Sequence, residues 1–130
     1  MINIPKSKRP IGITDGKLQP CPKTPNCVST QATDVKHRHE PLKYSTSIEQ
    51  AKEKIRSILN SLKRTIIVTD TENYIHAEVR TATFKFVDDV EFLFDDSEKL
   101  LHYRSAARSG ISDMGVNKKR MKNIRKLYLQ

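Results

Sequence analysis

The spacing of apolar residues after position 46 predicts a helix, then four strands, then a second helix. Between 47 and 62, apolar side chains recur every three or four residues, which is the period of a helix with one buried face. Ser47 and Gln50 have the spacing of a capping box and mark the start of this helix. From 65 to 108, apolar and polar residues alternate instead, as they do along half-buried strands. We therefore expect strands at 65–69, 74–80, 87–95 and 100–108.

The third and fourth of these strands carry a pattern that fixes their register. A four-residue turn, DSEK, sets Phe92 opposite Tyr103 and Glu91 opposite Arg104. A shift of one residue would place phenylalanines against charged side chains, so this pairing is favoured. The turn is short, and short turns join antiparallel strands.

A second helix is expected to begin at Ser112 or Asp113, because either residue can cap a helix. Its inner face is formed by Met121, Ile124 and Tyr128, while most of its lysines and arginines point outward. The whole pattern predicts an α+β fold, with a four-stranded antiparallel sheet and both helices covering its apolar face. A long irregular N-terminal segment precedes these elements.

Two segments before the first helix differ in composition. Residues 1–17 are basic and contain proline and glycine but few large apolar residues, which predicts a flexible basic arm. Residues 21–44 are expected to be irregular because their prolines block helix. The chain length fits one domain, for which we expect the bounds 18–130. The pattern does not predict an oligomeric state.

The net charge of +9 is concentrated at the two ends of the chain. Residues 1–44 hold eight Lys and Arg against three acidic residues, and residues 104–130 hold eight against one. Basic ends favour RNA, DNA or an acidic membrane surface, but no aromatic stacking platform or reader motif accompanies them. No apolar run is long enough to span a membrane, and the N-terminus lacks the apolar region of a signal peptide. We therefore expect a soluble, cytoplasmic protein.

Two cysteines, Cys21 and Cys27, enclose a short loop that contains two prolines. In an oxidising compartment they can form a disulfide, and in a reducing one they stay as quiet thiols. With His37 and His39 they also make up a Cys₂His₂ set, although the spacing matches no usual zinc motif. A nucleophilic Cys27 with His37 as its base is a weaker alternative. We expect a scaffold role for the loop, with neither a metal nor a cofactor.

A set of charged residues is expected to share the polar face of the sheet, because side chains two residues apart on a strand lie on the same face. Arginines in a fixed array bind carboxylates or phosphates, and paired carboxylates can exchange protons. The structural alternative is a solvated face with ion pairs, in which Asp113 caps the last helix and Arg120 binds Asp88 or Asp89. The predicted ligand-binding residues are Glu78, Arg80, Asp89, Glu91, Arg104, Ser105, Arg108, Asp113, Asn117 and Arg120.

Two motifs stand out, one in the predicted N-terminal loop and one in the last strands. The first is CPKTPNCVSTQATD at 21–34, and the second combines DDVEF at 88–92 with RSAARSGISDMGVNKKR at 104–120. In this order they resemble the signatures of an uncharacterised family called domain of unknown function 1499. The resemblance extends from Leu18 to the end of the chain and departs at Ala107, where many relatives carry serine. It implies no activity, but its polar signature residues favour a functional role for the polar face.

These patterns support three hypotheses about function. The leading one is a small binding domain whose acid–arginine face holds a small polar or anionic ligand or a segment of a partner protein. The second is a hydrolase-like enzyme with Asp89 or Glu91 as its base and Arg104 as an electrophilic clamp. The third is contact with RNA or DNA through the basic arm and the last helix.

Overall fold

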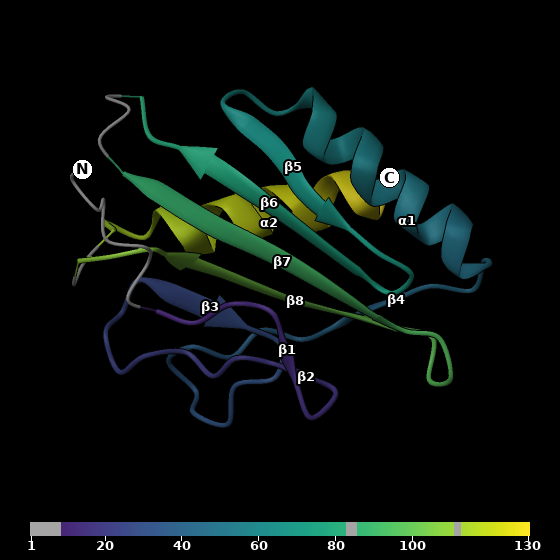
Figure 1. Ribbon diagram of the computed structural model, residues 1–130, viewed down its shortest axis with the longest axis horizontal. Coiled ribbons are helices and arrows are strands. Elements are labelled where there is room, and N and C mark those ends of the chain that lie inside the picture. Colours follow the sequence, from purple (N-terminus) through teal and green to yellow (C-terminus); the bar gives the residue numbers. More distant parts are fainter. Residues whose placement is uncertain (1–8, 83–85, 111–112) are drawn as a thin grey trace, which may run out of the picture.

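The computed structural model describes residues 9–82, 86–110 and 113–130. Its centre is a six-stranded antiparallel sheet in the order β3-β8-β7-β6-β5, with β4 also pairing with β8 (Figure 1). A separate hairpin is formed by β1 and β2. The strands are β1 (Ile13–Thr14), β2 (Lys17–Leu18), β3 (Cys27–Ser29), β4 (Leu42–Lys43), β5 (Thr65–Asp70), β6 (Tyr74–Arg80), β7 (Val87–Asp95) and β8 (Leu100–Ala107). The helices are α1 (Ile48–Ser61) and α2 (Val116–Tyr128).

The α+β class and the antiparallel sheet are confirmed, but the prediction of four strands is wrong. The two additional strands, β3 and β4, come from the segment that was expected to be irregular. Cys27 pairs with Ala106 and Leu42 pairs with Leu101, so both segments satisfy the edge of β8 that faces away from β7. Strands of two or three residues between prolines are too short to show an alternating pattern, and this is why the sequence did not reveal them.

The register predicted for the two longest strands is confirmed. Phe92 lies opposite Tyr103 and Glu91 lies opposite Arg104 across β7 and β8. Strand β6 pairs with the other edge of β7 and sets Ile75 opposite Phe92. Most apolar side chains of the three strands therefore share one face and most charged ones share the other, with Asp88 as a charged residue on the apolar face.

Both helices cover the apolar face of the sheet, as predicted (Figure 1). Ile55 of α1 and Ile124 of α2 are fully buried against Phe92 and its neighbours. Helix α1 begins after Ser47, whose hydroxyl accepts the backbone N–H of Gln50 while the Gln50 side chain accepts the backbone N–H of Ser47, so the capping box is confirmed. Within the described ranges, neither helix is long and apolar enough to cross a membrane.

Helix α2 begins later than predicted. Its first residue is Val116, so the predicted start at Asp113 is wrong, and Ser112 lies outside the described residues. The cause is Gly115, which occupies the N-cap position with φ of 76° in the left-handed region that glycine tolerates. Asp113 still serves this end of the helix, because its carboxylate accepts the backbone N–H groups of Gly115 at 2.8 Å and Asn117 at 3.0 Å.

The chain that follows Arg9 lies across the polar face of the sheet. Leu18 packs against Tyr74 and Leu93 in a small apolar cluster, and the backbone N–H of Gly12 donates to Glu91 Oε2 at 2.7 Å. This segment therefore buries part of a face that the alternation pattern leaves open to water. Residues 1–8 of the predicted basic arm lie outside the described residues, and the division at residue 17 stays a prediction.

Candidate functional site

The predicted site residues separate into groups on opposite faces of the sheet. Asp88 and Asp89 are neighbours in β7, and successive side chains of a strand point to opposite faces. Asp89 points to the polar face, where it meets His76, Glu78 and Arg108; we call these four residues the pocket network. Asp88 points to the helix-covered face and contacts Arg120, which also bonds Ser105 and Asn117. We call these four residues the helix network: Asp88, Ser105, Asn117 and Arg120.

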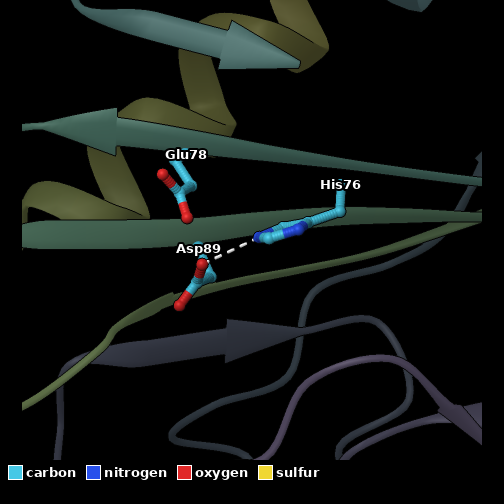
Figure 2. Close-up of side chains that lie close together, drawn as sticks. All are labelled: His76, Glu78 and Asp89. Atoms are coloured by element: carbon cyan, nitrogen blue, oxygen red, sulfur yellow. Dashed lines mark hydrogen bonds and ion pairs between the residues drawn. The ribbon is translucent and has the colours of Figure 1, made fainter. Parts of the chain in front are cut away.

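The pocket network is built from the adjacent strands β6 and β7 and from Arg108, the residue that follows β8. Asp89 of β7 accepts two hydrogen bonds from Arg108, from Nε at 3.1 Å and from Nη2 at 2.7 Å, and the same Nη2 donates to Glu78 Oε2 at 2.6 Å. His76 Nε2 lies 2.8 Å from Asp89 Oδ1 (Figure 2). Asp89 is only 2% exposed, so its charge is held inside the protein by His76 of β6 and by Arg108, which follows β8.

An open pocket of about 480 Å³ lies over the pocket network. Its floor is the polar face of β6 and β7. One wall is the N-terminal segment and the other is β5, where the register shifts between Ile67 and Thr69 and leaves Val68 half-exposed. The volume is within the range of small-molecule sites. The lining residues are Arg9, Pro10, Ile11, Val68, Thr69, His76, Glu78, Asp89 and Arg108.

The charges in the pocket favour an ionised Asp89. Burial by itself would raise the pKa of Asp89, but hydrogen bonds from His76 and Arg108 outweigh it and hold the pKa below its ordinary value. The same contact with Asp89 raises the pKa of Arg108. A carboxylate with a lowered pKa is a poor proton acceptor at neutral pH, so this geometry does not favour Asp89 as a general base.

The contact with Asp89 also determines which atoms of the pocket remain available. In the neutral tautomer that carries its proton on Nε2, His76 donates a hydrogen bond to the ionised carboxylate, and Nδ1 is an acceptor. Among the described residues, neither His76 Nδ1 nor Glu78 Oε1 has a hydrogen-bond partner. Both residues line the pocket. The pocket therefore offers acceptor atoms to a ligand.

Glu91 and Arg104 form a buried pair next to the pocket network. They are 0% and 1% exposed, and Arg104 Nη1 lies 3.4 Å from Glu91 Oε1. The hydroxyl of Tyr74 donates to Glu91 Oε2 at 2.5 Å, and Arg104 Nη2 donates to the carbonyl of Pro20 at 3.3 Å. Arg104 Nε is buried and has no partner within the described part of the chain. With the N-terminal segment in place, this pair does not offer a base and a clamp to a substrate.

The helix network holds α2 on the sheet. Arg120 Nη2 donates to Asp88 Oδ2 at 2.7 Å, and Arg120 Nη1 donates to Ser105 and Asn117. Burial raises the pKa of Asp88, and the charge of Arg120 offsets this effect only in part. Four of the predicted ligand-binding residues therefore lie on the other side of the sheet from the pocket: Ser105, Asp113, Asn117 and Arg120. As the structural alternative proposed, Asp113 accepts backbone N–H groups at the start of α2 and Arg120 binds Asp88. Arg80 is exposed at the end of β6.

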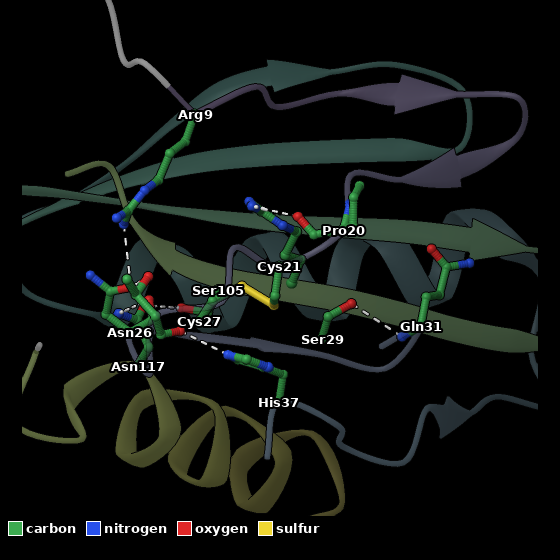
Figure 3. Close-up of a disulfide and its surroundings, with 12 residues drawn as sticks. Arg9, Pro20, Cys21, Asn26, Cys27, Ser29, Gln31, His37, Ser105 and Asn117 are labelled. Carbon is green, nitrogen blue, oxygen red and sulfur yellow. Dashed lines mark hydrogen bonds between the residues drawn. A yellow bond between two sulfur atoms is a disulfide. The ribbon is translucent and has the colours of Figure 1, made fainter. Parts of the chain in front are cut away.

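Cys21 and Cys27 form a disulfide in the structure. The two histidines of the alternative metal set make other contacts: His37 bonds Asp34 and the carbonyl of Thr24, and His39 bonds the hydroxyl of Tyr103. Beside the disulfide, Asn26 connects the N-terminal segment, the end of β8 and α2. Its side chain accepts from Arg9 and donates to the carbonyl of Gly110 at 3.0 Å, and its carbonyl accepts from Asn117 at 3.4 Å (Figure 3).

Three contributors to the pocket were absent from the predicted set: His76, the N-terminal segment and the wall that Val68 and Thr69 form on β5. His76 alternates with Glu78 along β6, so its place on the polar face follows from the pattern, but its contact with Asp89 does not. The N-terminal segment was expected to be a flexible arm, and nothing in its composition points to the wall that Arg9, Pro10 and Ile11 form.

The comparison with known families agrees with the two motifs. The model of a family described as "Protein of unknown function (DUF1499)" matches residues 17–127, which include both motifs, the disulfide and every strand of the main sheet. The chain belongs to the DUF1499 family. The family description assigns no activity to a DUF1499 protein. None of the curated proteins matches this DUF1499 chain.

Proposed function

We propose that this DUF1499 domain binds a small polar ligand and that the pocket network is its binding site. The observation that carries the proposal is the convergence of His76, Glu78, Asp89 and Arg108 at one open pocket. Three of the side chains come from the adjacent strands β6 and β7, and Arg108 directly follows β8, so the sheet fixes their relative positions before any ligand arrives. A site built on such a rigid scaffold binds without a large ordering cost.

The burial of Asp89 separates this group from an ordinary surface ion pair. An exposed pair contributes at most about 1 kcal/mol, whereas a buried carboxylate costs several kcal/mol to desolvate and needs good partners to offset that cost. A charged group held in this way beside a pocket is a typical feature of a functional site. The pocket also has apolar walls at Ile11 and Val68, which suit a ligand that has a polar end and an apolar body.

The available atoms define the kind of ligand that we favour. His76 Nδ1 and Glu78 Oε1 are acceptors, so the ligand should present hydrogen-bond donors or positive charge to them. This argues against an anion as the main ligand, because Glu78 would repel it. A side chain of a partner protein with the same donors would make the same contacts, and peptides belong in the test for that reason.

A ligand screen on the full chain tests the proposal. We expect small amines, amides and lysine- or arginine-containing peptides to shift the backbone amide NMR signals of His76, Glu78 and Asp89. Glu78→Gln removes the charge and should weaken such a ligand at least tenfold. The matched control is Glu98→Gln, which changes an exposed acid in the β7–β8 turn and should have no effect. Ligands that shift signals elsewhere, or that bind both variants equally, would refute the proposal.

A further inference from the structure

The pocket contains a set of atoms arranged as metal ligands are. One ring nitrogen of His76 and one carboxylate oxygen each of Glu78 and Asp89 all lie within 4.8 Å of one another (Figure 2). Nitrogen and oxygen ligands bind zinc in a tetrahedron at about 2.0–2.2 Å, so the ligand atoms around the ion are about 3.3–3.6 Å apart. Side-chain movements of about 1 Å would therefore bring all three atoms onto one ion.

The chemistry of these three residues favours a particular class of ion. One imidazole with two carboxylates suits Zn²⁺, Mn²⁺ or Fe²⁺, whereas Ca²⁺ and Mg²⁺ prefer oxygen ligands throughout. The other coordination positions would face the pocket and remain open to water or to a second ligand. His76 is 4% exposed, so the packing around it limits the movement of the ring, and its Nε2 already lies 2.8 Å from Asp89 Oδ1.

Arg108 competes with a metal ion for the same oxygens. Its guanidinium binds both carboxylates, at 2.6 Å from Glu78 and 2.7 Å from Asp89. The Arg108 side chain is 29% exposed, so it can move toward solvent when a stronger cation arrives. A divalent ion would then neutralise both carboxylates, which the single charge of Arg108 does not. The proton on His76 Nε2 would shift to Nδ1, and Nε2 would then bind the metal with no change in the charge of the ring.

We infer that the pocket binds a divalent transition-metal ion through His76, Glu78 and Asp89, with Arg108 as an internal cation that competes with it. This inference rests on the proposed function, since it names the ligand class of the same pocket. It has a consequence that a site for an anion, which Arg108 would help to hold, does not share. Removal of the arginine should strengthen metal binding, although arginine is normally counted among the residues that hold a ligand.

The test is a titration of the full chain with Mn²⁺, followed by paramagnetic broadening of the backbone NMR signals. Binding at the site should broaden His76 and Asp89 first. Glu78→Gln should weaken Mn²⁺ at least tenfold and Arg108→Met should strengthen it at least tenfold. Arg38→Met is the matched control, because Arg38 pairs with Glu40 on an exposed surface and its loss should leave the affinity unchanged. Thermal unfolding of each variant establishes whether it folds. If Arg108→Met does not fold, Glu78→Gln still tests the inference.

The outcomes separate the two proposals. Broadening centred elsewhere, or equal Mn²⁺ affinity in the wild type and Glu78→Gln, overturns the metal inference. If a metal fails to bind while an amine or peptide binds and is weakened by Glu78→Gln, the metal inference is wrong and the proposed function stands. If neither class of ligand reaches the pocket, both are wrong.

Discussion

Replacing Arg120 with methionine should show what the helix network contributes to stability. The change keeps a long apolar side chain but removes the guanidinium that neutralises Asp88 from 2.7 Å away. Asp88 is 5% exposed at its side chain, so water cannot replace the lost partner. Ser105 and Asn117 lose a donor as well, but they remain hydrogen-bonded to each other at 2.6 Å. The main cost should therefore arise at Asp88.

Two estimates bound the loss of stability caused by Arg120→Met: the cost of an unpaired buried charge and the cost of protonating Asp88. Removing one partner of a buried ion pair costs about 3–5 kcal/mol. The buried carboxyl can escape the penalty by taking up a proton, which costs about 1.36 kcal/mol for each pH unit above its ordinary pKa of 3.8. That ceiling is about 4.4 kcal/mol at pH 7 and about 1.6 kcal/mol at pH 5. We therefore expect Arg120→Met to lower the free energy of unfolding by about 3–4 kcal/mol at pH 7.

The loss of stability in Arg120→Met should depend on pH, and the pKa of Asp88 determines the direction of this dependence. Burial already raises the pKa of Asp88 in the folded protein, and the loss of Arg120 should raise it further. The folded variant then binds a proton more readily than the unfolded chain, so the stability deficit shrinks as the pH falls from 7 toward 3.8. Between pH 7 and pH 5 the deficit should decrease by at least about 1.5 kcal/mol.

Urea unfolding followed by circular dichroism at pH 7 and pH 5 measures this effect. The double variant Asp88→Asn, Arg120→Met has no charge at this contact, so its stability relative to the wild type should change much less between the two pH values. Arg38→Met removes an arginine whose pair with Glu40 is exposed, and it should cost no more than about 0.5 kcal/mol. A deficit for Arg120→Met that is below about 1 kcal/mol, or that does not change with pH, would refute the reasoning.

Three further changes test other parts of the fold by the same unfolding measurement. Reduction of the disulfide, which closes a loop of seven residues, should cost about 2 kcal/mol, and an unchanged urea midpoint would contradict this. Ser47→Ala removes the α1 cap and should cost about 1 kcal/mol, whereas Ser57→Ala, at an exposed position inside α1, should be neutral or slightly stabilising. Tyr74→Phe should cost about 1.5–3 kcal/mol because it breaks a buried hydrogen bond to Glu91. The control is Tyr44→Phe, which breaks a hydrogen bond to the half-exposed Asp96, and an equal loss of stability in the two variants would contradict the prediction.

The long strands were predictable because each of their residues favours the same pairing. In β7 and β8, a shift of one residue would set Phe92 and Tyr103 against charges, so this register is favoured by the sequence. The short strands β3 and β4 have no such signal, because they exist only where β8 offers its edge. The start of α2 was misplaced because capping chemistry at Asp113 is visible in the sequence, whereas the left-handed backbone at Gly115 depends on the surrounding structure.

The polar face was predictable in composition but not in exposure. Alternation correctly placed Glu78, Asp89 and Arg108 together, since strand geometry alone determines which face a side chain occupies. The cover over Glu91 and Arg104 depends instead on backbone groups of the N-terminal segment, the N–H at Gly12 and the carbonyl at Pro20. Every residue except proline has such an N–H, and every residue has a carbonyl, so no sequence pattern marks the ones that will be used.

The two neighbouring aspartates show why one motif need not describe one site. Asp88 and Asp89 have the same side chain and the same strand, but burial raises the pKa of one while His76 and Arg108 lower that of the other. The difference arises because alternation sends one to the helix layer and the other to the pocket. Asp88→Asn should therefore change the stability of the protein and leave ligand binding intact. Asp89→Asn should weaken binding at the pocket, so the two variants separate the structural part of the motif from its functional part.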